Sequence, residues 1–410
     1  MYEGLRPESR PSLTSFASTA NYRPVSEQFR TVLSGKGGFQ SFPVYTISIP
    51  QPEEIMTISV RFTEQDWQRI ERDWNAWWAG DLDRALVVLE THAPLAGSAD
   101  TSTLTKFGLD TPADVLLDNW QNILEGVNYH GDAFPKWRVR FGPGVMAAFL
   151  GSDVSWTPDT AWFWPLEGVD SLKDIRIQYD PDNLWWKRVK EVTLRAVERW
   201  GNQVLVGITD IGGSLDILAS LRGSQKLLLD LTDEPGEVDR LAREITALWL
   251  FYYAELERIT SSVRRGNTCW APVWSPKPGY MLQSDFSYMI SPRMFRRFVL
   301  PDLEACCARL DYGFYHMDGK GELPHLDMLI GIERLRGIQW QPGDGQPKAE
   351  GWLDVLARIR NGGKLCQVFV TRQGAIKIQK ELGGKGFLMN IVDDDMSPEE
   401  AEAFVEHFRR

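Results

Sequence analysis

The sequence predicts an α/β protein of the (β/α)8 TIM barrel class with an irregular N-terminal extension. After residue 62, eight short apolar runs follow one another, and most are separated by segments long enough for a helix. This alternation is typical of the strands and helices of such a barrel. Polar residues stand where these runs end, and barrel enzymes place their chemistry at the carboxyl ends of the strands.

Residues 1–55 differ from the rest of the chain. Ser, Thr, Pro and Gly dominate them and no helical period persists, so we predict a tail lying over the main domain or a poorly ordered extension. The barrel is predicted over residues 56–410. In its first helix, Thr63 and Asp66 can cap the free amides of the first turn, and apolar residues follow at helical spacing.

The remaining elements are predicted from short apolar runs and from amphipathic patterns. The strands are predicted at Arg84–Glu90, Trp137–Phe141, Gln203–Thr209, Thr268–Trp274, Gly313–Met317, Arg336–Gln341, Lys364–Val370 and Gly386–Ile391. Helices are predicted at Pro235–Thr260, Pro292–Leu310, Trp352–Asn361 and Ser397–Phe408. The stretch Asn119–Pro165 is irregular, which indicates an insertion around the second strand.

The composition argues against several classes of protein. A net charge of −11 without a sustained Lys/Arg run argues against a nucleic-acid or anionic-membrane surface. No run of about 18 apolar residues is present, so we expect no membrane span. Four cysteines without a CxxC pair favour a reduced, cytoplasmic enzyme. The 17 tryptophans indicate either aromatic packing or a large, partly aromatic pocket.

Side chains at the strand ends predict the active site. His316 and Asp318 alternate at the end of the fifth predicted strand, so they point to the same side, and Asp210 ends the third strand. The same edge carries the candidate substrate-binding residues Tyr280, Gln283, Asp285, Trp340, Gln341, Arg372 and Asn390. Because carboxylates outnumber the cations Arg372 and Lys320 there, we expect a ligand with few anionic groups.

Each of these residues also has a structural explanation. His316 can be a hydrogen-bonded structural histidine, and Asp393–Asp395 can cap the helix that begins near Ser397. Asp210 and Asp318 fit the capping explanation less well, because a glycine follows each of them within two residues.

Several motifs resemble the uroporphyrinogen decarboxylase superfamily. They are Leu215–Asp230, Asp233–Pro235, Asp285–Pro292 with Phe295, Phe298–Pro301, His316–Gly319 and Gly386–Asn390. The superfamily includes porphyrinogen decarboxylases and the corrinoid-dependent and coenzyme M methyltransferases. The resemblance runs from about Trp67 to the C-terminus and implies a (β/α)8 barrel with its active site at the strand ends.

The methyltransferase branch binds zinc through a His-x-Cys on the fifth strand and a cysteine near the end of the eighth. This sequence is similar in His316, but Asp318 stands where the first cysteine would be and Asp393 lies near the second. The resemblance therefore implies a divalent-metal site at His316, Asp318 and Asp393, with harder ligands than a zinc–thiolate site.

The decarboxylase branch is a poorer match. Its substrate-binding arginine motif near the N-terminus is absent, and Asp132 alone occupies a position similar to that of its catalytic aspartate. A porphyrinogen with several carboxylate arms also suits an acidic protein without that clamp poorly.

The favoured hypothesis is a methyltransferase-like enzyme that acts on a small molecule or with a corrinoid partner, as a monomer or homodimer. Its candidate catalytic residues are His316, Asp318, Asp210 and Asp132. The alternatives are a decarboxylase of a porphyrinogen-like or other carboxylated substrate, with Asp132 or Asp210 stabilising positive charge, and a non-catalytic barrel that binds a tetrapyrrole or a corrinoid.

Overall fold

The structure, a computed structural model, describes residues 23–24, 45–46, 58–92, 109–156, 160–201, 203–262, 265–393 and 396–409. The chain divides into two units, residues 1–53 and 54–410. In the first unit, β1 (Arg23–Pro24) pairs antiparallel with β2 (Tyr45–Thr46). The rest of the predicted extension lies outside the described residues, so its character and its boundary stay predictions.

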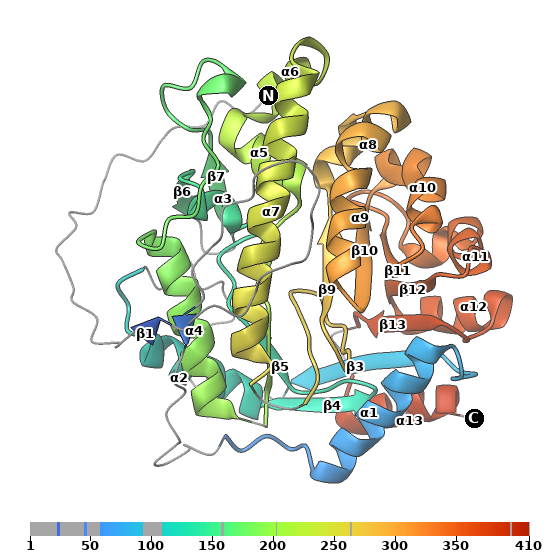
Figure 1. Cartoon of the computed structure of the whole chain (residues 1–410). Helices are drawn as coiled ribbons and strands as arrows, with labels where there is room; N and C mark the ends of the chain where they lie inside the picture. Colours follow the sequence, from blue (N-terminus) through green and yellow to red (C-terminus); the bar gives the residue numbers. More distant parts are fainter. Residues whose placement is uncertain are drawn as a thin grey trace. The chain divides into compact units, whose positions relative to one another are not determined.

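The second unit is a mixed α/β fold with a parallel central sheet (Figure 1). Its strands are β3 (Leu86–His92), β4 (Val127–Gly131), β5 (Lys136–Arg138), β6 (Asp153–Trp156), β7 (Ala161–Trp164), β8 (Leu205–Gly207), β9 (Gly279–Gln283), β10 (Tyr312–Asp318), β11 (Leu335–Gln341), β12 (Leu365–Val370) and β13 (Phe387–Ile391). Seven of the described strands pair in the order β4-β3-β13-β12-β11-β10-β9, and only the β3–β4 pair is antiparallel. β5 and β8 form a separate parallel pair, and β6 and β7 an antiparallel one.

Helices cover this sheet. They are α1 (Glu64–Ala79), α2 (Ala113–Glu125), α3 (Met146–Phe149), α4 (Leu184–Trp200), α5 (Ser214–Arg222), α6 (Ser224–Asp233), α7 (Pro235–Thr260), α8 (Pro292–Phe298), α9 (Leu300–Arg309), α10 (Leu326–Gly331), α11 (Leu353–Asn361), α12 (Arg372–Leu382) and α13 (Pro398–Arg409). Short 3-10 turns are η2 (Leu172–Asp174), η3 (Asp285–Met289), η4 (Lys320–His325) and η5 (Ala349–Gly351). α9, α11 and α12 pack against β10, β12 and β13 (Figure 1). Over the part of the chain that the structure describes, no helix is long and apolar enough to cross a membrane.

Most predicted elements are confirmed, and the fourth strand is a correction. Within Thr268–Trp274 the structure has only an isolated bridge, from Cys269 to Ile208, and the strand beside β10 is β9 instead. Pro272 cannot donate to a ladder, which explains the interruption, whereas every residue of β9 is buried. The predicted helix Pro292–Leu310 is two helices, α8 and α9, divided at Val299 just before Pro301.

The closed barrel stays a prediction. Among the described residues, no strand ladder joins the β5–β8 pair to β3 or to β9. What the structure supports is a mixed α/β fold in which strands alternate with helices along most of the chain.

The first helix covers the amino-terminal end of the central strands. The predicted cap is present, because Oγ1 of Thr63 accepts from Asp66 N at 3.2 Å and Asp66 Oδ2 accepts from Thr63 N at 2.9 Å. On the buried face of α1, the Trp78 ring lies 4.8 Å from that of Tyr312, the first residue of β10. The Trp77 ring stacks 6.1 Å from Phe314. Burial of each large apolar side chain stabilises the fold by about 1.5–3 kcal/mol, so this tryptophan cluster packs the core and leaves the opposite end of the strands open for a site.

Candidate active site

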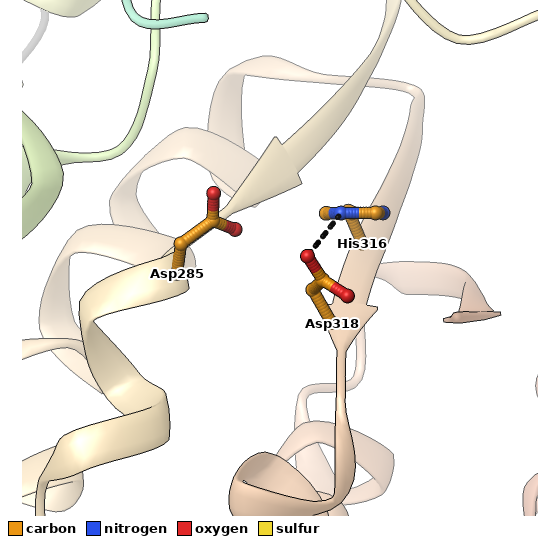
Figure 2. Close-up of side chains that lie close together, drawn as sticks. All are labelled: Asp285, His316 and Asp318. Carbon is orange, nitrogen blue, oxygen red and sulfur yellow. Dashed lines mark ion pairs between the residues drawn. The ribbon is translucent and has the colours of Figure 1, made fainter. Parts of the chain in front are cut away.

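Three side chains converge at the carboxyl ends of neighbouring strands. His316 and Asp318 lie at the end of β10, and Asp285 begins η3, one residue after Ser284 and two after β9 (Figure 2). One ligand atom from each lies within 4.8 Å of the other two, and Nε2 of His316 is 3.8 Å from Oδ2 of Asp318. The prediction that His316 and Asp318 point to the same side is therefore confirmed.

A chain of amide hydrogen bonds holds the ring of His316. Nδ1 of His316 donates to Oε1 of Gln339 on β11. Nε2 of Gln339 donates to Oε1 of Gln367 at 2.9 Å, and Nε2 of Gln367 donates to Oδ1 of Asn390 at 2.8 Å. The chain thus crosses four adjacent strands, β10 to β13. Because Nδ1 is committed as a donor, Nε2 is the nitrogen that faces the two carboxylates.

The backbone of Asp318 is held on both sides. Asp318 N donates to Oε1 of the buried Glu322 at 3.1 Å, and Tyr315 Oη donates to Oε2 of Glu322 at 2.7 Å. Gly319 N donates to Gln341 O at 2.7 Å. Gly319 has φ 90°, and a Cβ there would lie 2.9 Å from the Tyr288 ring, so the turn after Asp318 requires glycine.

The charges of His316, Asp318 and Asp285 shift the pKa values in this cluster. Burial lowers the pKa of His316, but Asp318 and Asp285 outweigh that effect and raise it to about 9. Asp285 stays exposed to solvent, yet the protein surrounding its carboxyl raises its pKa; His316 opposes the rise and Asp318 adds to it. Without a metal, the protonated imidazole is therefore the cation that compensates the two carboxylates.

Two further buried carboxyls stand behind Asp285. Asp216 Oδ1 accepts from Phe286 N at 2.8 Å, and its Oδ2 has no hydrogen-bond partner among the described residues. Burial, with the charge of Asp285, raises the pKa of Asp216. Asp210 Oδ1 accepts from Gly212 N at 2.9 Å, and burial raises the pKa of Asp210 to about 6.

His316 and Asp318 line a large cavity. Its volume is about 900 Å³, and Trp270, Gln339 and Gln341 also line it. The Trp270 ring lies 5.3 Å from the imidazole of His316, edge to face. This volume lies at the upper end of the range for small-molecule and cofactor sites, so the cavity can enclose a whole ligand beside the three side chains.

The structure does not bring Asp393 to the cluster. Oδ2 of Asp393 accepts from Arg372 N at the start of α12 and lies 3.6 Å from Nε of Arg372. The prediction of a metal site with Asp393 is therefore corrected: Asp285, predicted as a substrate contact, occupies the third position. Asp394 and Asp395 lie outside the described residues.

The other predicted substrate contacts divide into two groups. Gln341 lines the cavity, and Asn390 ends the amide chain. Tyr280 is buried and its hydroxyl bonds the backbone at Thr209 and Ile211, which makes it a packing residue. Trp340 is also buried, against Trp352. Gln283 is buried at the end of β9, and its Oε1 has no partner among the described residues.

Asp132 lies at the other end of the sheet. Its carboxylate accepts from Nη1 and Nη2 of Arg84 at 2.7 and 2.9 Å and from Val87 N, near the start of β3, at 2.8 Å. Trp74 on α1 donates to its carbonyl at 3.1 Å. The geometry is that of a buried structural ion pair, so the predicted catalytic role of Asp132 is not supported.

Replacing Asp132 with Asn is therefore expected to lower stability and spare the site. Loss of the charge-assisted bonds to Arg84 should reduce the free energy of unfolding by about 2 kcal/mol. Urea unfolding measures this, and ligand or metal binding at the His316 cluster should be unchanged. Weakened binding with unchanged stability would return Asp132 to the active site.

The donor set of the cluster fits a divalent cation. A metal-binding histidine usually donates its other ring N–H to an oxygen acceptor, and Gln339 supplies that acceptor for His316. Two carboxylates with one imidazole suit Mn²⁺, Fe²⁺ or Zn²⁺ better than softer ions. Asp285, His316 and Asp318 would hold the ion.

Sequence reasoning missed several residues near the site. Arg138 and Trp270 line the cavity, and Glu322 holds Asp318 from behind. Glu322 follows Asp318 by four residues. An acidic residue in the turn directly after the strand could therefore have been predicted as a contact of Asp318. Arg138 is not among the predicted strand-end residues, because the second strand is predicted to end at Phe141. In the structure, β5 ends at Arg138 itself.

Comparisons with known proteins agree with the fold. No model of a protein family matches the sequence, and no curated protein matches it. Among solved structures, the chain is similar to a methyltransferase from Methanosarcina mazei, with a TM-score of 0.54 and 12% identity over 85% of this chain and 100% of that one. At this identity the likeness shows a shared fold alone, and the resemblance to the uroporphyrinogen decarboxylase superfamily stays a prediction.

Proposed function

We propose that the protein is a methyltransferase-like enzyme that holds a divalent metal ion at Asp285, His316 and Asp318. The convergence of these three side chains at the carboxyl ends of the strands is the observation that carries the proposal. The similar fold of a solved methyltransferase supports it. The substrate is a small molecule that enters the cavity lined by His316 and Asp318.

Each group has a role in this proposal. A divalent ion would act as a Lewis acid that lowers the pKa of a substrate thiol, hydroxyl or water, which prepares it to accept a methyl group. Gln339 fixes the tautomer of His316, and Glu322 fixes the backbone of Asp318. Trp270 forms an apolar wall of the cavity against His316, which limits the water around the reacting atoms. The methyl donor is a second small molecule or a corrinoid protein.

Decarboxylation of a carboxylated substrate is the second candidate. Asp210 is the residue that favours it, because a buried carboxyl with a pKa raised to about 6 can hold or release a proton near neutral pH. Asp132 is committed to Arg84 and is not part of this alternative. A barrel that binds a tetrapyrrole or corrinoid without catalysis is the third candidate.

Ligand titrations separate the three candidates. Zn²⁺ or Mn²⁺, cobalamin and coproporphyrin are added separately while tryptophan fluorescence is followed, since Trp270 lines the cavity. The proposal expects one-to-one metal binding. Tight coproporphyrin binding with no metal binding would favour the other two candidates, and turnover assays would then decide between them.

Replacing Asp318 with Asn is expected to lower metal affinity by about a hundredfold. Loss of one anionic ligand removes both a metal bond and a compensating charge. Isothermal titration of the chelator-treated protein with Mn²⁺ and Zn²⁺ measures this. Asp344→Asn is the matched control, because Asp344 lines the same cavity but is outside the three-residue cluster. Equal affinities in the two variants would contradict the metal site.

A further inference from the structure

The cavity is lined by cations that have no ion-pair partner among the described residues. Arg138, Lys320 and Lys348 line it, and no described carboxylate forms an ion pair with any of them. The chain has 56 acidic and 45 basic side chains, so an acidic partner was readily available. Lys320 and Lys348 are exposed to water, which solvates them, whereas Arg138 is largely enclosed. Arg138 is therefore the cation whose charge needs an explanation.

Among the described residues, only the Nε of the Arg138 guanidinium has a hydrogen-bond partner. Nε donates to Trp270 O at 2.9 Å, and no described residue accepts from Nη1 or Nη2. Asp210, the acid that most stabilises its charge, bonds the backbone at Gly212 instead of contacting it. Burial lowers the pKa of Arg138, and the charge of Asp210 opposes that effect. The two terminal nitrogens, which no described residue occupies, match the two oxygens of a carboxylate or phosphate.

Trp270 connects Arg138 to the three-residue cluster. Its carbonyl accepts from Arg138, its ring packs against His316, and its Nε1 donates to Met281 O at 2.8 Å. The residue is therefore fixed between the two sites. Arg138 and His316 line one cavity of about 900 Å³, so one ligand can contact both.

We propose that Arg138 binds an oxyanion group of the substrate. Binding at Arg138 places the other end of the same molecule at Asp285, His316 and Asp318. The substrate class is a small molecule with a single carboxylate, phosphate or sulfonate at one end. The guanidinium of Arg138, which is half-buried, matches one such group through its two terminal nitrogens. This identification of the substrate class rests on the proposed function, but anion binding at Arg138 can be measured without it.

The test uses the full chain freed of metal with a chelator. Inorganic phosphate, acetate and methanesulfonate are titrated calorimetrically, and acetamide serves as the uncharged counterpart of acetate. Wild-type protein should bind at least one of the anions and not acetamide, and the preferred anion shows whether the group is planar or tetrahedral. Arg138→Gln should weaken that binding by about tenfold or more, because charge-assisted hydrogen bonds are lost.

Two further variants make the result specific. Arg140→Gln removes the same charge from an exposed position close to Arg138 that does not line the cavity, and it should change affinity by about twofold or less. Arg138→Lys keeps the charge and should retain weaker binding, even if Arg138→Gln folds poorly. Equal binding in wild type, Arg138→Gln and Arg138→Lys, or no anion binding by wild type, would overturn the proposal.

Metal titration separates this proposal from the proposed function. Arg138→Gln should keep the metal affinity of wild type, because Arg138 is outside the cluster. Loss of anion binding in Arg138→Gln supports oxyanion binding by Arg138 even where wild type binds no metal. If wild type binds metal at the cluster but binds no anion, the proposed function is still supported and oxyanion binding by Arg138 is refuted.

Discussion

Replacing His316 with Ala is expected to abolish turnover and lower metal affinity by at least a hundredfold while the protein stays folded. Its Nε2 is the nitrogen that faces Asp318 and Asp285, and no other histidine of the described chain joins that group. Removing it leaves two carboxylates facing each other without their compensating cation. Calorimetric titration with Mn²⁺ or Zn²⁺ and a methyl-transfer assay measure the loss.

The stability cost from lost packing and hydrogen bonding in this variant should be small. The imidazole lies at a strand end facing the cavity. Among the described side chains it hydrogen-bonds only Gln339, which keeps its bond to Gln367 in the variant. Loss of one such bond costs about 1 kcal/mol, and water entering the cavity can replace it. Above pH 9, where the imidazole of the folded protein has lost its charge, urea unfolding should therefore show a change of about 1 kcal/mol or less in the free energy of unfolding.

His325→Ala is the matched control with the opposite expectation. His325 is fully buried, stacks 4.4 Å from Phe295 and bonds Ser287 O through Nε2 at 3.0 Å. Its loss leaves a cavity and should lower the free energy of unfolding by about 2 kcal/mol or more, with metal binding retained. If His316→Ala behaves like this control, losing stability and keeping turnover, His316 is a structural histidine.

The convergence of His316 and Asp318 was predictable from the sequence because it follows from local geometry. Alternate residues of a strand share a side, and Gly319 marks where the strand ends. The positions of β10 to β13 were predictable for the same reason, since each is an apolar run between helical segments. The prediction for the end of β10 was therefore confirmed.

The third member of the cluster depended on tertiary structure. Asp393 follows the last strand, as the resemblance implied, but its carboxylate caps the start of α12 through Arg372 N. Asp285 reaches the cluster because β9 pairs directly with β10 and carries the chain to the same edge. Which of two strand-end acids turns inward is decided by the backbone amides that each one meets, and local sequence does not contain that information.

Arg138 illustrates the effect of a strand boundary. A strand predicted to run to Phe141 places Arg138 in its interior, away from the mouth, whereas β5 ends at Arg138 and brings it to the cavity. A shift of three residues in one element was enough to hide the cation on which the substrate class depends. Strand ends are set by pairing, here with β8, more than by the residues themselves.

The buried carboxyls predict a strong dependence of stability on pH. Asp210, with its pKa raised to about 6, and Asp216, whose pKa is also raised, hold protons in the folded state that they lose in the unfolded state at their ordinary pKa of 3.8. Between these values the folded protein binds more protons than the unfolded chain. The free energy of unfolding of the metal-free protein should therefore be highest near pH 4 from these two groups. It should fall as the pH rises through 6 and further as Asp216 ionises.

Replacing Asp216 with Asn is expected to remove much of this dependence. The amide oxygen can keep the bond from Phe286 N, and the side chain no longer acquires a charge beside Asp285. At pH 8 the variant should be more stable than wild type by about 2 kcal/mol or more, and near pH 4 the two should differ little. Urea unfolding of both metal-free proteins from pH 4 to 8 measures this, with Asp344→Asn, an exposed carboxylate, as the control. Parallel curves for wild type and Asp216→Asn would mean that Asp216 is already ionised in the folded protein. In that case His316 would have to compensate the charge of Asp285 while Asp216 is also ionised beside it.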